Sequence, residues 1–357
     1  MSRLPQVTPD LEFEFRNDPY IIDAYNICLK HEEKFATSDN EVRRIRILGL
    51  LLFYAPKQEI RVYVAKSILS CQDDSEALVK IDRCFELHVI LPFKKYREGR
   101  TPVASTHSSR SSIESRWKDV KANIAQVPPR NHQDAKDRAL IRDNWKCIVT
   151  GSIHRHAPRE ILDSPATKIR TYLECAHIVP EGSFFNVKEK EKPGGDHKAQ
   201  LDYAATILTV LEPFGCDISD CNGEKVHSLV NVITMQKDIR DLFCRLELYF
   251  EATPTENCYE IKYYDGKPFP DMADFVTFST PPSDESPGYL PVPSSELLAL
   301  HATCCKVARM SGAAEYIDRV YDDVDGLGVL DWDGSSGDLL RYKLLSLSSS
   351  EVGDHGQ

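Results

Sequence analysis

The sequence predicts an α+β protein, in which a helical N-terminal region precedes a region of mixed strands and helices. Two observations support this class. Residues 17–92 place apolar side chains at helical spacing, whereas residues 145–278 contain several short apolar runs of strand length. A chain of 357 residues with 41% hydrophobic residues is long enough for two or three domains or for one large domain.

Three apolar stripes predict the helices of the N-terminal region, which we assign to residues 1–95. The first stripe runs from Val42 to Leu52 and follows Ser38-x-x-Glu41, which has the form of a capping box. A second helix runs from Glu59 to Leu69 and follows Pro56. A third begins at a cap, Asp73 or Ser75, runs through Phe85 and ends before Pro92. These stripes are most simply the core of a small helical bundle, with partner binding as the alternative.

The middle of the chain is predicted as a linker over residues 96–130 and a compact domain over residues 131–280. The linker is rich in Ser, Thr, Arg and Pro. A helix over residues 134–143 places Arg138 and Arg142 on one face, where they would contact phosphate or form a solvated surface. The other elements predicted in this domain are strands at 145–149, 171–179, 247–250, 259–263 and 275–278, and a helix at 236–246.

The C-terminal part begins with a helix in residues 281–315, capped by Ser294 or Ser295, which we expect to pack on the core. Residues 316–357 are acidic and rich in Gly and Ser, so we expect a disordered tail. Its segment 315–338 would serve as a solvated terminus or as a docking tail.

The net charge of −11 is unevenly distributed along the chain. Residues 101–180 hold 13 Lys and Arg against 8 Asp and Glu, an excess of five positive charges. Residues 266–357 hold 6 against 15, an excess of nine negative charges. Because phosphate binding depends on the local field, the global sign does not exclude a nucleic-acid partner.

Cysteine usage and hydropathy indicate an intracellular protein. The eleven cysteines follow no repeating frame, and the first residues lack the apolar core of a signal peptide, so reduced thiols are expected. The sequence contains no apolar stretch of about 18 residues, and we expect no membrane partner. Without a compact basic cluster, the sequence does not distinguish nucleus from cytoplasm, and it sets no oligomeric state.

Three sequence runs have the pattern of a phosphodiesterase site. They are Lys146–Gly151, Glu174-Cys-Ala-His177-Ile-Val-Pro180 and Asn231–Phe243. Phosphodiester hydrolysis needs a base that removes a proton from water, a cation that neutralises the transition state, and stabilisation of the leaving oxygen. A unit of two strands and one helix can supply these groups within a few dozen residues.

These runs resemble the HNH endonucleases, whose fold is a ββα-metal unit. More narrowly, the chain is similar to HNH-domain proteins of filamentous and mushroom-forming fungi. The similarity covers most of residues 35–315. It extends to the flanking runs Phe53–Pro56, Ser70–Asp74, Pro92–Arg97 and Leu300–Ala314.

The resemblance implies roles for individual residues. His177 takes the place of the general base, and Asn231 that of a metal ligand or backbone anchor. The family's final histidine lies nine positions after the asparagine, where this chain has Arg240. An Asp that often precedes the first histidine as a metal ligand is replaced by Ala176.

The implied cofactor is a divalent metal, Mg²⁺ or Mn²⁺, bound through Asn231 and substrate phosphate. Arg240 would contact phosphate in place of histidine, although an arginine repels a dication and cannot replace imidazole as a ligand. Asp238 would either reach the metal or cap the helix. Glu174 is a poor ligand candidate, because three positions along a strand place it opposite His177.

Other interpretations involve histidine and cysteine. His177 alone would fit a buried core histidine. A Cys175–His177 pair would form a nucleophile. Structural zinc is not expected, because the spacings lack paired CxxC motifs; its candidate ligands are Cys147, Cys175, Cys216, Cys221 and His154.

Two functional hypotheses follow. The first is a metal-dependent HNH endonuclease acting on nucleic acid, with DNA favoured over RNA. The second is a catalytically degenerate HNH-like module that binds nucleic acid or protein. Which hypothesis applies depends on whether catalysis survives the replacement of the family's final histidine by Arg240.

Overall fold

The computed structural model describes residues 2–94, 128–163, 169–180, 212, 223–268, 272–279, 290–325 and 337. These residues form two compact units. The helical unit contains residues 2–94, 212, 300–325 and 337, and the mixed unit contains the described residues of 128–180 and 223–299. Within the described ranges, no helix is long and apolar enough to cross a membrane.

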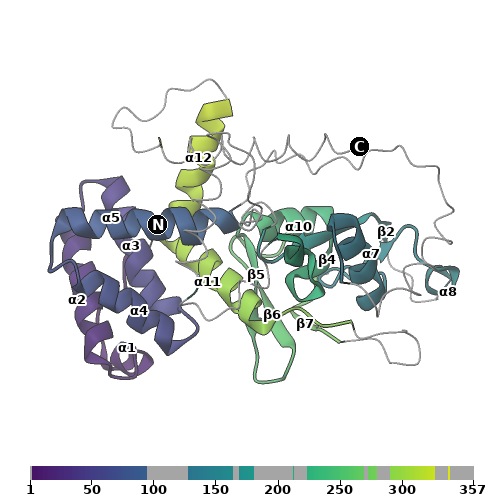
Figure 1. Ribbon diagram of the computed structural model, residues 1–357, viewed down its shortest axis with the longest axis horizontal. Helices are drawn as coiled ribbons and strands as arrows, with labels where there is room; N and C mark the ends of the chain where they lie inside the picture. The colour runs from purple at the N-terminus through teal and green to yellow at the C-terminus, as the bar shows by residue number, and fades with distance from the viewer. Residues whose placement is uncertain are drawn as a thin grey trace. The chain divides into compact units, whose positions relative to one another are not determined.

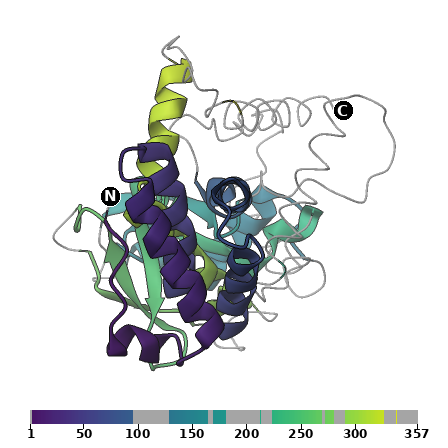
Figure 2. The ribbon, with the colours of Figure 1, turned by 90° about the vertical axis from the view of Figure 1, so that its left-hand side faces the viewer.

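The helical unit is built on helices that share one apolar core. Helices α2, α3 and α4 contact one another, and α5 packs on α3. The purple N-terminal helices of Figure 2 accordingly lie side by side. The helices are α1 (Pro9–Glu14), α2 (Pro19–Lys34), α3 (Asp39–Tyr54), α4 (Gln58–Leu69), α5 (Ser75–Phe85), α11 (Ser295–Ser311), whose first residues belong to the mixed unit, and α12 (Ala313–Asp325). The predicted stripes are therefore confirmed as helices.

The predicted caps were partly wrong. Ser38 is the N-cap of α3, but its side chain makes no capping hydrogen bond, so the capping box is not formed. The cap of α5 is Asp74, which accepts a hydrogen bond from the Glu76 amide. A π-helical turn, Glu86–Ile90, and a 3₁₀ turn, Leu91–Phe93, extend the chain beyond α5.

Helix α12 continues the ordered chain past residue 315, where we predicted the tail to begin. Tyr316 is buried, and the guanidinium of Arg43 lies 3.5 Å from its ring centroid. Lys94 also forms an ion pair with Asp318 at 2.8 Å. These contacts explain why the helix extends to Asp325 despite its acidic sequence. Residues 326–336 and 338–357 of the predicted tail lie outside the described residues, as do residues 95–127 of the predicted linker.

The mixed unit contains three small sheets. Strands β1 and β2 are parallel, β3 and β4 are antiparallel, and β5, β6 and β7 form an antiparallel sheet in that order. The strands are β1 (Ile153–His154), β2 (Arg170–Thr171), β3 (Leu173–His177), β4 (Val232–Gln236), β5 (Leu248–Ala252), β6 (Cys258–Tyr263) and β7 (Phe275–Thr277). The helices are α7 (His132–Arg142), α8 (Arg159–Leu162) and α10 (Lys237–Cys244), with 3₁₀ turns η6 (Gly223–His227) and η7 (Leu229–Asn231). The predicted α+β class is confirmed.

The predicted strand at 145–149 was wrong. Asn144 and Trp145 both have left-handed backbone angles, with φ of 50° and 59°, which an extended strand does not allow. Only an isolated bridge joins Lys146 to Ile153. Strand β3 instead pairs with β4, with Cys175 opposite Thr234.

Helices α7 and α10 each contact both strands of the β3–β4 pair, and Figure 1 labels both helices near β4. Side chains alternate between the faces of a strand. His177 therefore lies on the α7 face, where its ring is 5.3 Å from that of His132. Glu174 lies on the α10 face, where it forms an ion pair with Arg240.

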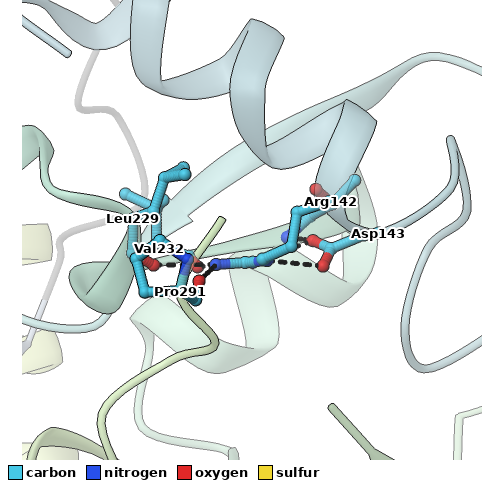
Figure 3. Close-up of polar contacts among 6 residues, drawn as sticks. Arg142, Asp143, Leu229, Val232 and Pro291 are labelled. Carbon is cyan, nitrogen blue, oxygen red and sulfur yellow. Dashed lines mark hydrogen bonds and ion pairs between the residues drawn. The ribbon is translucent and has the colours of Figure 1, made fainter. Parts of the chain in front are cut away.

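Arg142 joins α7 to the start of β4. Its guanidinium pairs with Asp143, with nitrogen–oxygen distances of 2.7 and 2.9 Å (Figure 3). It also donates to the carbonyl oxygens of Leu229 at 2.7 Å, Val232 at 2.8 Å and Pro291 at 3.3 Å. Our prediction that Arg142 contacts phosphate or solvent was therefore wrong, because its side chain is fully buried.

Replacing Arg142 with Met is expected to lower the free energy of unfolding by about 3–5 kcal/mol, because the buried Asp143 carboxylate loses its partner. Urea denaturation followed by circular dichroism measures this loss. Arg138→Met, on the same helix and only half-buried, is the matched control and should cost less than about 1 kcal/mol. Equal losses in the two variants would contradict the structural role of Arg142.

Candidate functional site

The end of β3 is joined to the start of β4 through Asn231. The Val179 amide donates to Asn231 Oδ1 at 2.8 Å, and Asn231 Nδ2 donates to the carbonyl oxygens of Val179 at 3.0 Å and Val226 at 2.9 Å. The Ile178 amide also donates to the Asn231 carbonyl at 2.8 Å. Asn231 is 0% exposed. Of the two roles left open for Asn231, this geometry favours the backbone anchor; a metal-ligand role stays a prediction.

Three histidines meet on the α7 face. His177 Nε2 lies 3.2 Å from His227 Nδ1, and the centroids of these two rings are 5.3 Å apart. The His132 ring, at the first residue of α7, is also 5.3 Å from that of His177. His177 and His227 are buried, with exposed fractions of 8% and 7%.

Sequence reasoning identified His177 but missed its two neighbours. His132 precedes the helix start that we predicted at residue 134, and His227 ends a short 3₁₀ turn. Neither belongs to a motif whose spacing points to His177. Only the pairing of β3 with β4, and the packing of α7 on both, brings the three rings together.

The α10 face carries a different chemistry. Arg240 is buried, pairs with Glu174 through Nη1, and lies 3.9 Å from Asp241 through Nη2. Alternation along β3 places Ala176 on this same face. Glu174 engages Nη1 of Arg240, whereas Nε has no hydrogen-bond partner among the described residues, so the contact between Arg240 and phosphate stays a prediction.

Asp238 lies in the first turn of α10 and is exposed. The N-cap of this helix is Gln236, and no side chain forms a capping hydrogen bond. The cap that we predicted as an alternative role for Asp238 is therefore not formed. Its metal-binding role stays a prediction.

The described side chains do not fit a divalent metal. Nowhere in the described ranges do three or more His, Cys, Asp or Glu residues gather in a way that could hold an ion. On the α10 face, the Glu174 carboxylate is engaged by a fixed cation, and Ala176 has no donor atom. The Asn231 amide is occupied by backbone groups. We therefore assign no chemical step to a metal.

The cysteine alternatives are not favoured by the local environment. Burial raises the pKa of Cys175 to about 12, so its thiol stays protonated at neutral pH and is a poor nucleophile or ligand. Cys147 is also buried. Cys216 and Cys221, the other cysteines in the zinc hypothesis, lie outside the described residues.

Comparison with known proteins agrees with this arrangement. Residues 147–251 match the model of the HNH_2 family, described as HNH endonuclease. The match includes β3, β4 and α10, together with His177, Asn231 and Arg240. No curated protein and no solved structure matches the chain. Residues 147–251 are therefore similar to the HNH endonuclease family, which supports a nuclease-like domain in this part of the chain.

Proposed function

We propose that this domain hydrolyses phosphodiester bonds of nucleic acid, with DNA favoured over RNA and His177 as the general base. The observation that carries the proposal is the position of His177. It lies at the end of β3, inside the matched region, where Asn231 fixes the following residues and His227 lies within hydrogen-bonding distance. Histidine is the side chain best suited to proton transfer near neutral pH.

The histidine pair determines which nitrogen of His177 accepts the proton. In one of its two proton arrangements, His177 Nε2–H donates to His227 Nδ1. Nδ1 of His177 is then the atom that accepts a proton from water. The resulting imidazolium is stabilised because its Nε2–H bond points at the lone pair of His227. His227 is thus a positioning residue, and it also shares the positive charge.

Helix α7 presents its amino end at this face. His132 is its first residue, so the positive end of the helix dipole lies beside the His177 ring, where it favours an anion and opposes the imidazolium. Backbone amides at helix starts attract phosphate groups. A phosphate brought to this position would place its phosphorus close to the water that His177 activates.

A second candidate is a domain that binds nucleic acid or protein without hydrolysing it. The Arg240–Glu174 ion pair favours this alternative, because it occupies the face where the family resemblance implies metal ligands. Dependence on Mg²⁺ or Mn²⁺ stays a prediction, since the described side chains provide no ligand set for these ions.

Nicking of supercoiled plasmid separates the two candidates. The purified chain is incubated with plasmid in Mg²⁺, Mn²⁺ or EDTA, and the products are resolved by gel electrophoresis. We expect nicking that falls by a factor of about 10²–10⁴ in His177→Ala, the contribution typical of a general base. His88→Ala, in the helical unit, is the matched control and should keep the wild-type rate.

Wild-type plasmid binding without nicking in any of the three conditions would favour the second candidate. Equal nicking by wild type and His177→Ala would remove His177 from the mechanism while leaving the activity in place.

Asn231→Asp tests the anchor that positions His177. The carboxylate keeps the shape of the amide but cannot donate to Val179 and Val226, and it buries a charge. We expect a loss of about 2–5 kcal/mol in the free energy of unfolding, measured by urea denaturation. Asn144→Asp, at an exposed position, should change the stability little. A metal ligand would tolerate aspartate, so unchanged stability and nicking in Asn231→Asp would contradict the anchor role.

A further inference from the structure

An aromatic and cationic surface precedes β3 in the mixed unit. We define the Tyr172 platform as Arg155, His156 and Tyr172, whose side chains are all exposed. Tyr172 is 57% exposed, which is unusual for so large a ring. The platform adjoins the parallel pair of β1 and β2, where the Arg155 amide donates to the Thr171 carbonyl at 2.8 Å.

The three side chains of the platform gather around one ring. The Arg155 guanidinium lies 5.5 Å from the centroid of Tyr172, within the range of a cation–π contact. The His156 ring is 5.8 Å from that of Tyr172. Beneath them, His154 is buried, with its ring 6.3 Å from Tyr172. The ring of Tyr172 thus has three side chains near it while much of its surface faces solvent.

The described, exposed residues near the platform in sequence carry a positive excess. They include four cations, Lys146, Arg155, Arg159 and Arg170, against two anions, Glu160 and Asp163. Burial lowers the pKa of His154 to about 4, with Lys136 and His156 contributing, so this imidazole stays neutral at neutral pH. The positive excess of two therefore comes from arginine and lysine, which keep their charge over the whole physiological range.

We propose that the Tyr172 platform binds unpaired nucleotides, with a base stacked on Tyr172 and phosphates held by Arg155 and the neighbouring cations. The proposal names a substrate class for the domain and rests on the proposed function. Stacking on an exposed aromatic ring needs a base whose face is free, which a duplex does not offer, whereas cations along the same surface follow the backbone. An acidic protein would pair with the arginines, but its carboxylates would make no stacking contact with the exposed ring.

Tyr172 directly precedes β3, and His177 ends it, so the two are about 17 Å apart along the extended chain. Their odd spacing places the two side chains on opposite faces. A single strand anchored at Tyr172 would therefore have to pass around the β3–β4 pair to reach the histidine pair. The shared chemistry is that of unpaired DNA or RNA, and separate probes distinguish these two sources.

The test is fluorescence anisotropy with labelled oligothymidylate and oligouridylate of about 15 nucleotides, and with a DNA duplex of the same length. Tyr172→Ala should weaken the Kd for the single-stranded probes by roughly 5- to 150-fold. Tyr172→Phe keeps the ring and should bind within about twofold of wild type. Tyr264→Ala, an exposed tyrosine in the same unit, is the matched control and should bind like wild type.

Several results would overturn the platform. They are single-strand binding by Tyr172→Ala that equals that of Tyr264→Ala, a preference for duplex that Tyr172→Ala does not alter, and the absence of wild-type binding to any probe. Because Tyr172 is exposed, each variant should keep the wild-type melting temperature, which confirms that it is folded.

Plasmid nicking by the same preparations separates this inference from the proposed function. Nicking by wild type with unchanged single-strand binding in Tyr172→Ala would overturn the platform alone. Binding that depends on Tyr172, without nicking, would support the platform and contradict hydrolysis.

Discussion

The hydrogen bonds of the Asn231 side-chain amide are the interactions on which the β3–β4 pair depends. These three bonds reach the backbone after β3, at Val179, and before β4, at Val226, and the side chain is fully buried. Arg142 reinforces them from α7 by binding the carbonyl oxygens of Leu229 and Val232. The segment 229–232 is therefore fixed both by Arg142 and by the side chain of its own Asn231. The position of His177 follows from this restraint, because His177 pairs with Val232, the residue that follows Asn231.

The two faces of the β3–β4 pair carry different kinds of polar side chains. On the α7 face, a hydrogen-bonded histidine pair can accept and share a proton. On the α10 face, Arg240 and Glu174 neutralise each other in a partly buried ion pair. The Glu174 carboxylate is therefore already paired with a cation of the chain itself. A region similar to the HNH endonuclease family thus carries an internal cation on this face.

Local patterns predicted most of the elements but few of the contacts. The stripe from Val42 to Leu52 and the strands at 247–250 and 259–263 were recognised because their periodicity lies within a single element. The bond between His177 and His227 joins residues 50 positions apart, and the bond from Arg142 to Val232 spans 90. Such contacts leave no mark on local spacing. The false strand at 145–149 has another cause, since left-handed backbone angles at its start do not alter hydrophobicity.

Paramagnetic broadening by Mn²⁺ distinguishes an ion pair from a metal site on the α10 face. Backbone amide signals of the isotope-labelled chain are recorded by NMR as Mn²⁺ is added. We expect no selective broadening at Ala176 and Arg240, because the guanidinium already neutralises Glu174. Selective loss of both signals at low Mn²⁺ concentration would show a metal bound on the α10 face and would refute the division of chemistry between the two faces.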